Sequence, residues 1–175
     1  QLRAGIHGLV LGGSLGEAST LTFPEKEAIT RFALERVNGE IPVVLNIAEG
    51  STREAVMQAK SAEQWGVQGI MLLPPMRYKS DYRETVTFFR SVAEATSLPL
   101  MLYNNPVDYK TEITLEMLEE LSVYAHIQAV KESTRDVTNV TRIINRFGDR
   151  FKVLCGVDTL IVEELVMGAD GIIGG

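Results

Sequence analysis

The chain has 175 residues, of which 45% are hydrophobic and 23% are charged, and this is the composition of a globular domain with a substantial core. Its 17 Lys and Arg residues against 23 Asp and Glu residues give a formal net charge of −6, which argues against nucleic acid or an anionic membrane as a partner. We expect the partner to be a small molecule or another subunit. The single cysteine excludes an internal disulfide, and together with two histidines it gives no metal-ligand spacing, so no metal site is expected.

Two further features concern location and length. No apolar run approaches the roughly 18 residues that cross a bilayer, and residues 1–7 lack the charged-then-apolar order of a signal peptide, so we expect a cytoplasmic protein. The chain begins at Gln1 without a methionine and stops at Gly175 directly after an apolar run. We therefore expect both ends to be cut from something longer.

Short runs rich in Val, Ile and Leu alternate with longer stretches of helical spacing. The expected strands are residues 8–11, 41–47, 69–73, 98–103, 127–130, 152–154 and 171–173. The expected helices are residues 24–37, 52–65, 82–95, 115–121, 137–147 and 160–167. Near-continuous hydrophobicity is typical of strands covered on both faces, as in a parallel sheet with crossover helices.

This alternation predicts an α/β protein built from βα units, either a doubly wound sheet or a TIM barrel. The glycines of Gly12-Gly13-Ser14-Leu15-Gly16 do not have the Gly-x-Gly-x-x-Gly spacing of a nucleotide-binding doubly wound sheet. Seven strand candidates also favour the barrel. Because a (β/α)8 barrel has eight strands and typically about 250 residues, we expect this one to be incomplete.

Reactive groups in a TIM barrel lie at the C-terminal ends of the strands. Lys131 closes the apolar run 127–130. Burial there would lower the pKa of its amine and leave a neutral nucleophile for a carbonyl, which is what a Schiff-base lysine requires. The alternative is a lysine that pairs with Glu132 or extends its ammonium into solvent, and the neighbouring motifs favour the reactive lysine.

Two other strand ends carry candidate groups. Tyr103 ends the run 98–102, beside Lys131 in strand order, and its phenol could move protons during imine formation. Its alternative role is that of a core tyrosine, and Pro106 could fix the loop that follows. The turn at residues 13–16 offers backbone N–H groups and a hydroxyl to a carboxylate, or serves only as a connection that Glu17 braces through backbone hydrogen bonds.

Four segments occur in one order along the chain: Gly-Ser-x-Gly-Glu at 13–17, Tyr-Asn-x-Pro at 103–106, Lys-Glu at 131–132 and Gly-x-Asp at 156–158. Together they resemble the dihydrodipicolinate synthase and N-acetylneuraminate lyase superfamily, a group of Schiff-base lyases on a TIM barrel, along essentially the whole chain. The resemblance implies a domain spanning residues 1–175 that lacks its first strand and its C-terminal helical region. It also implies a homo-oligomer, specifically a tetramer, and no cofactor.

Site residues follow from the resemblance position by position. Lys131 would form the imine with a small 2-oxo acid, and Tyr103 would be the acid/base group. Ser14 and the Leu15 amide would hold the substrate carboxylate. Ile173 matches a strand-end residue whose backbone carbonyl faces the active site. The structural residues near the site are Gly13, Gly16, Glu17 and Pro106, and the possible substrate or subunit contacts are Asn105, Arg77 and Tyr78.

The branch of the family is inferred from two departures. Asp108 stands where synthases that make dihydrodipicolinate carry an arginine, and Met76 stands where they place a tyrosine that reaches a neighbouring subunit. The segments Gly-Ser-Leu-Gly-Glu, Pro-Pro-Met-Arg-Tyr and Tyr-Asn-Asn-Pro resemble instead the branch that eliminates water or ammonia, as in 2-keto-3-deoxy sugar-acid dehydratases or 1-pyrroline-4-hydroxy-2-carboxylate deaminase, and we expect that reaction. The alternatives are dihydrodipicolinate synthesis, a pyruvate-dependent aldolase of the N-acetylneuraminate lyase type, and a non-catalytic 2-oxo-acid sensor, which would not need both Lys131 and Tyr103.

Overall fold

In residues 1–75 and 78–175, which the computed structural model describes, seven parallel strands form one sheet whose spatial order follows the chain. The strands are β1 (Leu9–Leu11), β2 (Val43–Ile47), β3 (Gly69–Leu72), β4 (Leu100–Asn104), β5 (Ile127–Glu132), β6 (Lys152–Cys155) and β7 (Gly171–Ile172). The α-helices are α1 (Phe23–Val37), α2 (Thr52–Trp65), α3 (Tyr82–Ala93), α4 (Pro106–Tyr109), α5 (Leu115–Leu121), α6 (Thr138–Phe147) and α7 (Ile161–Val166). Short 3-10 helices are η1 (Leu2–Ala4), η2 (Gly148–Arg150) and η3 (Asp158–Leu160).

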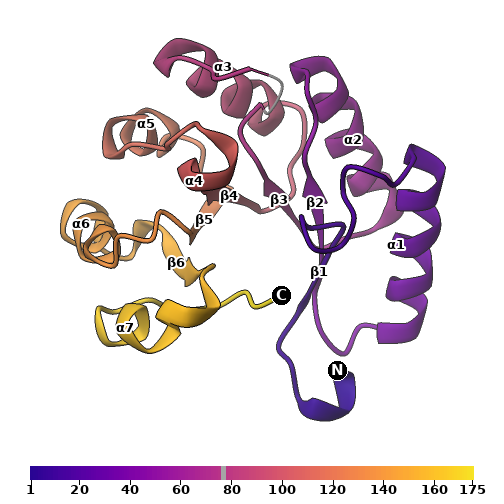
Figure 1. Ribbon diagram of the computed structural model, residues 1–175. Helices are drawn as coiled ribbons and strands as arrows, with labels where there is room; N and C mark the ends of the chain where they lie inside the picture. The colour runs from indigo at the N-terminus through magenta and orange to yellow at the C-terminus, as the bar shows by residue number, and fades with distance from the viewer. Residues whose placement is uncertain (76–77) are drawn as a thin grey trace.

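The sheet is curled into an arc with the strands inside and the helices around its outer side (Figure 1). Consecutive strands are neighbours in the sheet, and each pair is parallel. This arrangement confirms the predicted α/β fold of the TIM-barrel type. Within the described part of the chain, β1 and β7 are the two edges of the sheet.

Strand boundaries differ from the prediction for a physical reason. Two strands begin later than expected, at Val43 and Leu100, directly after Pro42 and Pro99. Proline has no amide hydrogen to give to the ladder, so it favours the position before a strand over one inside it. β5 in turn extends to Glu132, two residues beyond the expected end.

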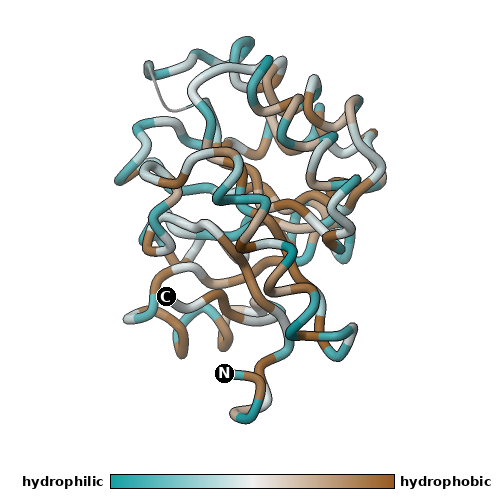
Figure 2. The backbone as a smooth tube through the Cα atoms, turned by 90° about the vertical axis from the view of Figure 1, so that its right-hand side faces the viewer, coloured by the Kyte–Doolittle hydropathy of each residue, from teal (hydrophilic) through white to brown (hydrophobic). Residues whose placement is uncertain are grey.

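Two apolar clusters occupy the two faces of the sheet. In β4, Leu100 and Leu102 belong to the large cluster between strands and helices, whereas Met101 and Tyr103 belong to a smaller cluster on the inner face. Apolar residues follow the strands in the middle of the molecule, and polar residues follow the outer turns (Figure 2). This period-two alternation places one side chain in two from each strand at the inner face.

Local signals fix the helix ends. Ser51 accepts a hydrogen bond from the Glu54 amide at 3.3 Å and caps α2, while Gly66 ends that helix with a left-handed φ of 90°. Thr22 forms a capping box with Glu25 at the start of α1. None of the helices in the described ranges is long and apolar enough to cross a membrane.

Candidate functional site

Lys131 and Tyr103 are brought together by a register shift between β4 and β5. Leu100 pairs with Ile127, but the next residue, Met101, pairs with Ala129, so Gln128 is an extra residue in β5. From that point Tyr103 lies opposite Lys131. Without the extra residue the alternation of β5 would be reversed beyond Ile127, and Lys131 would point toward the helices instead of the inner face.

The Lys131 amine lies over the face of the Tyr103 ring, with Nζ 4.5 Å from the ring centroid. Burial lowers the pKa of Lys131, and the nearby acidic groups of Asp158 and Cys155 only partly oppose this. A lowered pKa increases the fraction of neutral amine, the form that attacks a carbonyl. Burial therefore shifts Lys131 toward the neutral amine, the form that a Schiff-base lysine requires, and the role itself stays a prediction.

Gly156 leaves the space that the Lys131 side chain occupies, because it has no side chain of its own. A Cβ atom at this position would lie 2.6 Å from Cε and 2.9 Å from Cγ of Lys131, and it would also collide with Oγ of Ser133. Such separations are too short for real contacts, so the aliphatic stem of Lys131 runs where a side chain of residue 156 would otherwise be. The glycine of the Gly-x-Asp motif is therefore required for a steric reason, because any larger residue at position 156 would collide with Lys131.

Glu132 points away from Lys131, to the helix side of the sheet. Its carboxylate accepts hydrogen bonds from the Thr134 amide at 2.7 Å, from Nδ2 of Asn139 at 2.7 Å and from Nδ2 of Asn104 at 3.2 Å. Burial raises the pKa of Glu132, and these three donors oppose the rise. The alternative in which Lys131 simply pairs with Glu132 is therefore wrong, because alternation places the two side chains on opposite faces.

Tyr103 is buried and held by its neighbours. Nδ2 of Asn105 donates to the Tyr103 hydroxyl at 3.1 Å and to Oδ2 of Asp108 at 2.8 Å. The ring of Tyr109 meets the Tyr103 ring edge-on, at 5.8 Å between centroids. The Tyr109 hydroxyl in turn is hydrogen-bonded to Oγ of Ser14. Asn105 is thus a neighbour of the predicted acid/base group within the same chain.

Tyr109 is the member of this group that sequence reasoning missed. It ends α4, a single turn that begins at Pro106 and is capped by Asn105, whose Oδ1 accepts from the Asp108 amide at 3.2 Å. Lys110 closes the turn with a left-handed φ of 64°. No motif singled out Tyr109. The available signal was Asn-Pro, which is typical of a capped helix start and would have placed the next few side chains over the end of β4.

The turn after β1 brings Ser14 to the inner mouth of the sheet. The carbonyl of Gly13 accepts from the amides of Gly16 at 2.9 Å and Ala18 at 3.2 Å, and a Cβ at Gly16 would come within 3.1 Å of the Gly13 nitrogen. Glu17 has a φ of 61°, and its carbonyl accepts from the Thr20 amide at 2.9 Å. The predicted tight turn, with Glu17 bracing the loop through the backbone, is therefore present.

The end of the chain lies close to this turn. A Cβ atom at Gly175 would collide with the side chain of Leu15, which is 83% exposed, and Figure 1 shows the C-terminus on the inner side of the arc. Ile173 packs against the inner cluster, and its amide donates to the Cys155 carbonyl at 2.8 Å. Ser14 and Leu15, the predicted carboxylate-binding residues, thus lie on the same inner side of the arc as Ile173.

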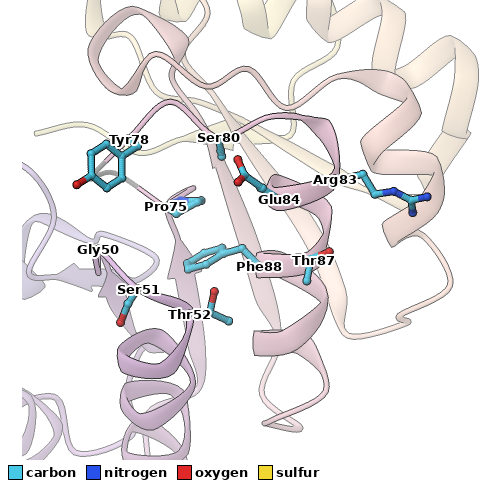
Figure 3. A pocket seen from close by; sticks show the side chains of 10 residues that line it. All are labelled: Gly50, Ser51, Thr52, Pro75, Tyr78, Ser80, Arg83, Glu84, Thr87 and Phe88. Atoms are coloured by element: carbon cyan, nitrogen blue, oxygen red, sulfur yellow. The ribbon is translucent and has the colours of Figure 1, made fainter.

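A pocket of about 530 Å³ lies elsewhere, between the start of α2 and one face of α3 (Figure 3). Phe88 projects into it opposite Ser51 and Thr52, and Tyr78 lies at its rim. Lys131 and Tyr103 are not among the residues that line it. Tyr78 thus lines this pocket, and its predicted contact with substrate or a neighbouring subunit stays a prediction. Arg77, the other predicted contact of that loop, and Met76 lie outside the described residues.

Comparison with known proteins gives a family and several relatives. The model of the family described as "Dihydrodipicolinate synthetase family" matches residues 1–175. A 4-hydroxy-tetrahydrodipicolinate synthase of Exiguobacterium sibiricum is 35% identical over 173 residues, which are 99% of this chain and 59% of that protein. The chain thus spans about three-fifths of the length of such curated relatives.

Solved structures give the same picture. The crystal structure of dihydrodipicolinate synthase from Aquifex aeolicus has a TM-score of 0.94 and 32% identity, covering 98% of this chain and 59% of that one. A prophage protein of the dihydrodipicolinic acid synthase family from E. coli K12, solved in complex with pyruvate, has a TM-score of 0.92 and 31% identity, covering 99% and 59%.

These relatives correct the predicted branch. The expectation of a dehydratase or deaminase is wrong, because the curated relatives that match nearly the whole chain at 31–35% identity are named 4-hydroxy-tetrahydrodipicolinate synthase, which was the alternative. The expectation depended on Asp108, on Met76 and on the likeness of three loop segments to the elimination branch. In the structure the Asp108 carboxylate accepts a hydrogen bond from Asn105, so it has a local role in holding α4 and is not simply a charge presented to substrate.

Proposed function

The chain belongs to the dihydrodipicolinate synthetase family, and from this premise we propose that its inner site forms an imine between Lys131 and pyruvate and joins it to an aldehyde, as a 4-hydroxy-tetrahydrodipicolinate synthase does. The observation that carries the proposal is the position of the Lys131 amine, 4.5 Å from the centroid of the Tyr103 ring, with a pKa that burial lowers. A partly dehydrated amine beside a buried phenol has the two groups that imine formation needs.

The proposed steps balance without another reactant. The neutral Lys131 amine attacks C2 of pyruvate, and proton transfer from nitrogen to oxygen gives a carbinolamine. Tyr103 protonates the departing hydroxyl, which leaves as water, and the C2–N double bond forms. Loss of a proton from C3 gives an enamine, because the protonated imine accepts the electron pair. The enamine carbon then attacks the carbonyl carbon of the aldehyde, and the resulting alkoxide takes up a proton equivalent to the one lost from C3. Attack of the aldehyde substrate's own amino group on C2 closes the ring and releases the Lys131 amine.

Ser14 and Leu15 are the proposed carboxylate binders. Their support is the tight turn at the C-terminal end of β1, which holds Ser14 beside Tyr109 and at the same mouth as Tyr103. A backbone amide and a hydroxyl in such a turn suit a carboxylate. That role, the contribution of the Ile173 carbonyl, and the oligomer implied by the resemblance stay predictions.

The second substrate proposed is aspartate semialdehyde. The position where synthases carry an arginine is Asp108 here, and its carboxylate is turned to Asn105 at 2.8 Å. We therefore expect this chain to bind the carboxylate of aspartate semialdehyde more weakly than synthases with the arginine do. Its KM for this substrate should be higher than theirs, while imine formation with pyruvate is unaffected.

A condensation assay tests the proposal. Pyruvate and aspartate semialdehyde are supplied together, and the cyclic product is followed with wild-type protein, Lys131→Met and the control Lys60→Met, which changes an exposed lysine on α2. Wild type and the control should turn over, and Lys131→Met should lose at least about 1,000-fold in kcat, as expected for loss of a covalent nucleophile. Equal turnover by Lys131→Met, or no carbon–carbon bond formed by wild type with this or other aldehydes, would overturn it.

A further inference from the structure

Three residues that carry hydroxyl groups lie between solvent and the buried acid/base group. Ser14 is exposed, Tyr109 is half-buried and Tyr103 is only 7% exposed. Ser14 and Tyr109 share a hydrogen bond, and Tyr109 meets Tyr103 edge-on with ring centroids 5.8 Å apart. All three belong to one chain and come from the ends of β1 and β4.

The Tyr103 hydroxyl is oriented for proton transfer. Its oxygen accepts a hydrogen bond from Nδ2 of Asn105 at 3.1 Å, so its own proton is left for another acceptor. The same Asn105 amide group donates to Asp108, and its Oδ1 caps α4, which fixes the Asn105 side chain. Asn105 thus ties the position of Tyr109, at the end of α4, to the position of the Tyr103 hydroxyl.

We infer that Tyr109 is a positioning and proton-relay residue, which together with Ser14 returns protons to Tyr103 from solvent within a single chain. The inference rests on the proposed function. When Tyr103 gives its proton to the departing hydroxyl of the carbinolamine, the resulting phenolate regains a proton from the Ser14–Tyr109 hydroxyl pair, and the pair recovers its proton from water at Ser14. In the resemblance, Met76 stands where synthases place a tyrosine that reaches a neighbouring subunit, whereas Tyr109 belongs to the same chain as Tyr103.

The chemistry of Tyr109 suits the role. Burial raises the pKa of Tyr109, with the nearby Tyr103 and Asp108 adding to the rise and the Ser14 hydrogen bond opposing it. The Tyr109 hydroxyl therefore keeps its proton over the neutral pH range and is available as a donor. A phenol that stayed ionised could accept but not supply protons.

Tyr109→Phe is the test, because it removes the hydroxyl and keeps the ring that contacts Tyr103. The rate of imine formation is followed in single turnover, by trapping with borohydride after set times with pyruvate, across pH. We expect the rate to fall at least about 10-fold while half-saturation by pyruvate changes less than about twofold. Small buffer acids such as imidazolium should restore the rate in the variant but not accelerate wild type, a rescue that a purely structural role would not produce.

Controls separate this inference from the proposed function. Tyr82→Phe makes the same change at a surface tyrosine whose hydroxyl donates to Glu120 at 2.6 Å, and it should leave the rate unchanged. Ser14→Ala combined with Tyr109→Phe should cost little more than Tyr109→Phe alone, because the two hydroxyls act as one unit. If wild type is trapped at Lys131 but Tyr109→Phe reacts at the wild-type rate, or loses rate without buffer rescue, the relay is refuted while the imine chemistry stands. If wild type is not trapped, both fail.

Discussion

The space around Lys131 sets what a single residue change can do at this site. Gly156 faces the stem of Lys131, and a methyl group there would lie 2.6 Å from Cε. We expect Gly156→Ala to displace the Lys131 side chain and to slow imine formation with pyruvate at least about 10-fold, because a small misplacement of a nucleophile costs that much or more.

The measurement is the single-turnover trapping rate, with the thermal unfolding midpoint as a check that the variant is folded. Overpacking of this kind typically costs about 1–3 kcal/mol, so the variant should still fold. A folded Gly156→Ala protein that is trapped at the wild-type rate would show that Lys131 reacts from another side-chain conformation.

Glu164 on α7 has a buried carboxylate beside the Cys155 thiol. Burial raises the pKa of Glu164, and the neighbouring thiol only partly opposes this rise. The folded chain therefore holds this proton to higher pH than the unfolded chain does. Between the ordinary value of 4.5 and the raised pKa the folded state binds more protons, so the stability contributed by this group falls as pH rises through that window.

Glu164→Gln should remove this dependence. We expect the free energy of unfolding of the variant to rise relative to that of wild type as pH rises from 4 to 7. In that range the folded wild type must either bury a charged carboxylate or bind a proton, and glutamine does neither. Urea unfolding of both proteins at the two pH values gives the difference in free energy. A difference that does not change with pH would contradict the assignment, and Glu54→Gln on the exposed start of α2 serves as the control.

Arg150 connects elements through their backbones. Its guanidinium donates to the carbonyl of Ile127 at 2.7 Å, to that of Tyr124 at 2.8 Å and to that of Ser122 at 2.7 Å, and it lies over the Phe151 ring. This joins η2 to the segment between α5 and β5. The same segment leads into the strand that carries Lys131.

Arg150→Lys should destabilise the fold by about 2 kcal/mol, because an ammonium cannot reproduce the planar fork that serves three carbonyls. The free energy of unfolding in urea measures this. Arg142→Lys is the matched control, since Arg142 makes an exposed pair with Asp136, and it should change stability by less than about 0.5 kcal/mol. Equal effects of the two substitutions would show that the backbone contacts of Arg150 carry no special weight.

The bounds of helices and strands could be predicted from the sequence where apolar periodicity and capping residues agreed. They could not be predicted where a single side chain determines the local backbone geometry. Helix α2, with Ser51 before it and Gly66 after it, was predicted with its observed bounds. The short α4 was not, because it depends on the Asn105 cap and spans only four residues. The shift that turns Lys131 inward was not predicted either. Gln128, a polar residue in an apolar run, was its only trace in the sequence.

At the level of the whole molecule, the order of strands and helices predicted the fold type, because parallel strands joined by crossover helices have few possible arrangements. The motifs also placed Lys131, Tyr103 and Ser14 at one mouth, since the C-terminal ends of parallel strands meet there. The predicted reaction branch, that of a dehydratase or deaminase, was wrong. Asp108 was interpreted from its place in the resemblance, where synthases carry an arginine. In the structure its carboxylate accepts a hydrogen bond from Asn105, a contact that follows from folding and not from sequence spacing.

The central claim is that Lys131 forms an imine with a 2-oxo acid, and trapping tests it most directly. The protein is incubated with pyruvate, the imine is reduced with borohydride, and the protein is digested. The masses of the peptides are then measured by mass spectrometry. The account predicts that the peptide containing Lys131 gains the mass of pyruvic acid less one oxygen atom, and that Lys131→Met gains nothing. A folded wild-type protein in which Lys131 stays unmodified, or in which another lysine carries the adduct, would contradict it.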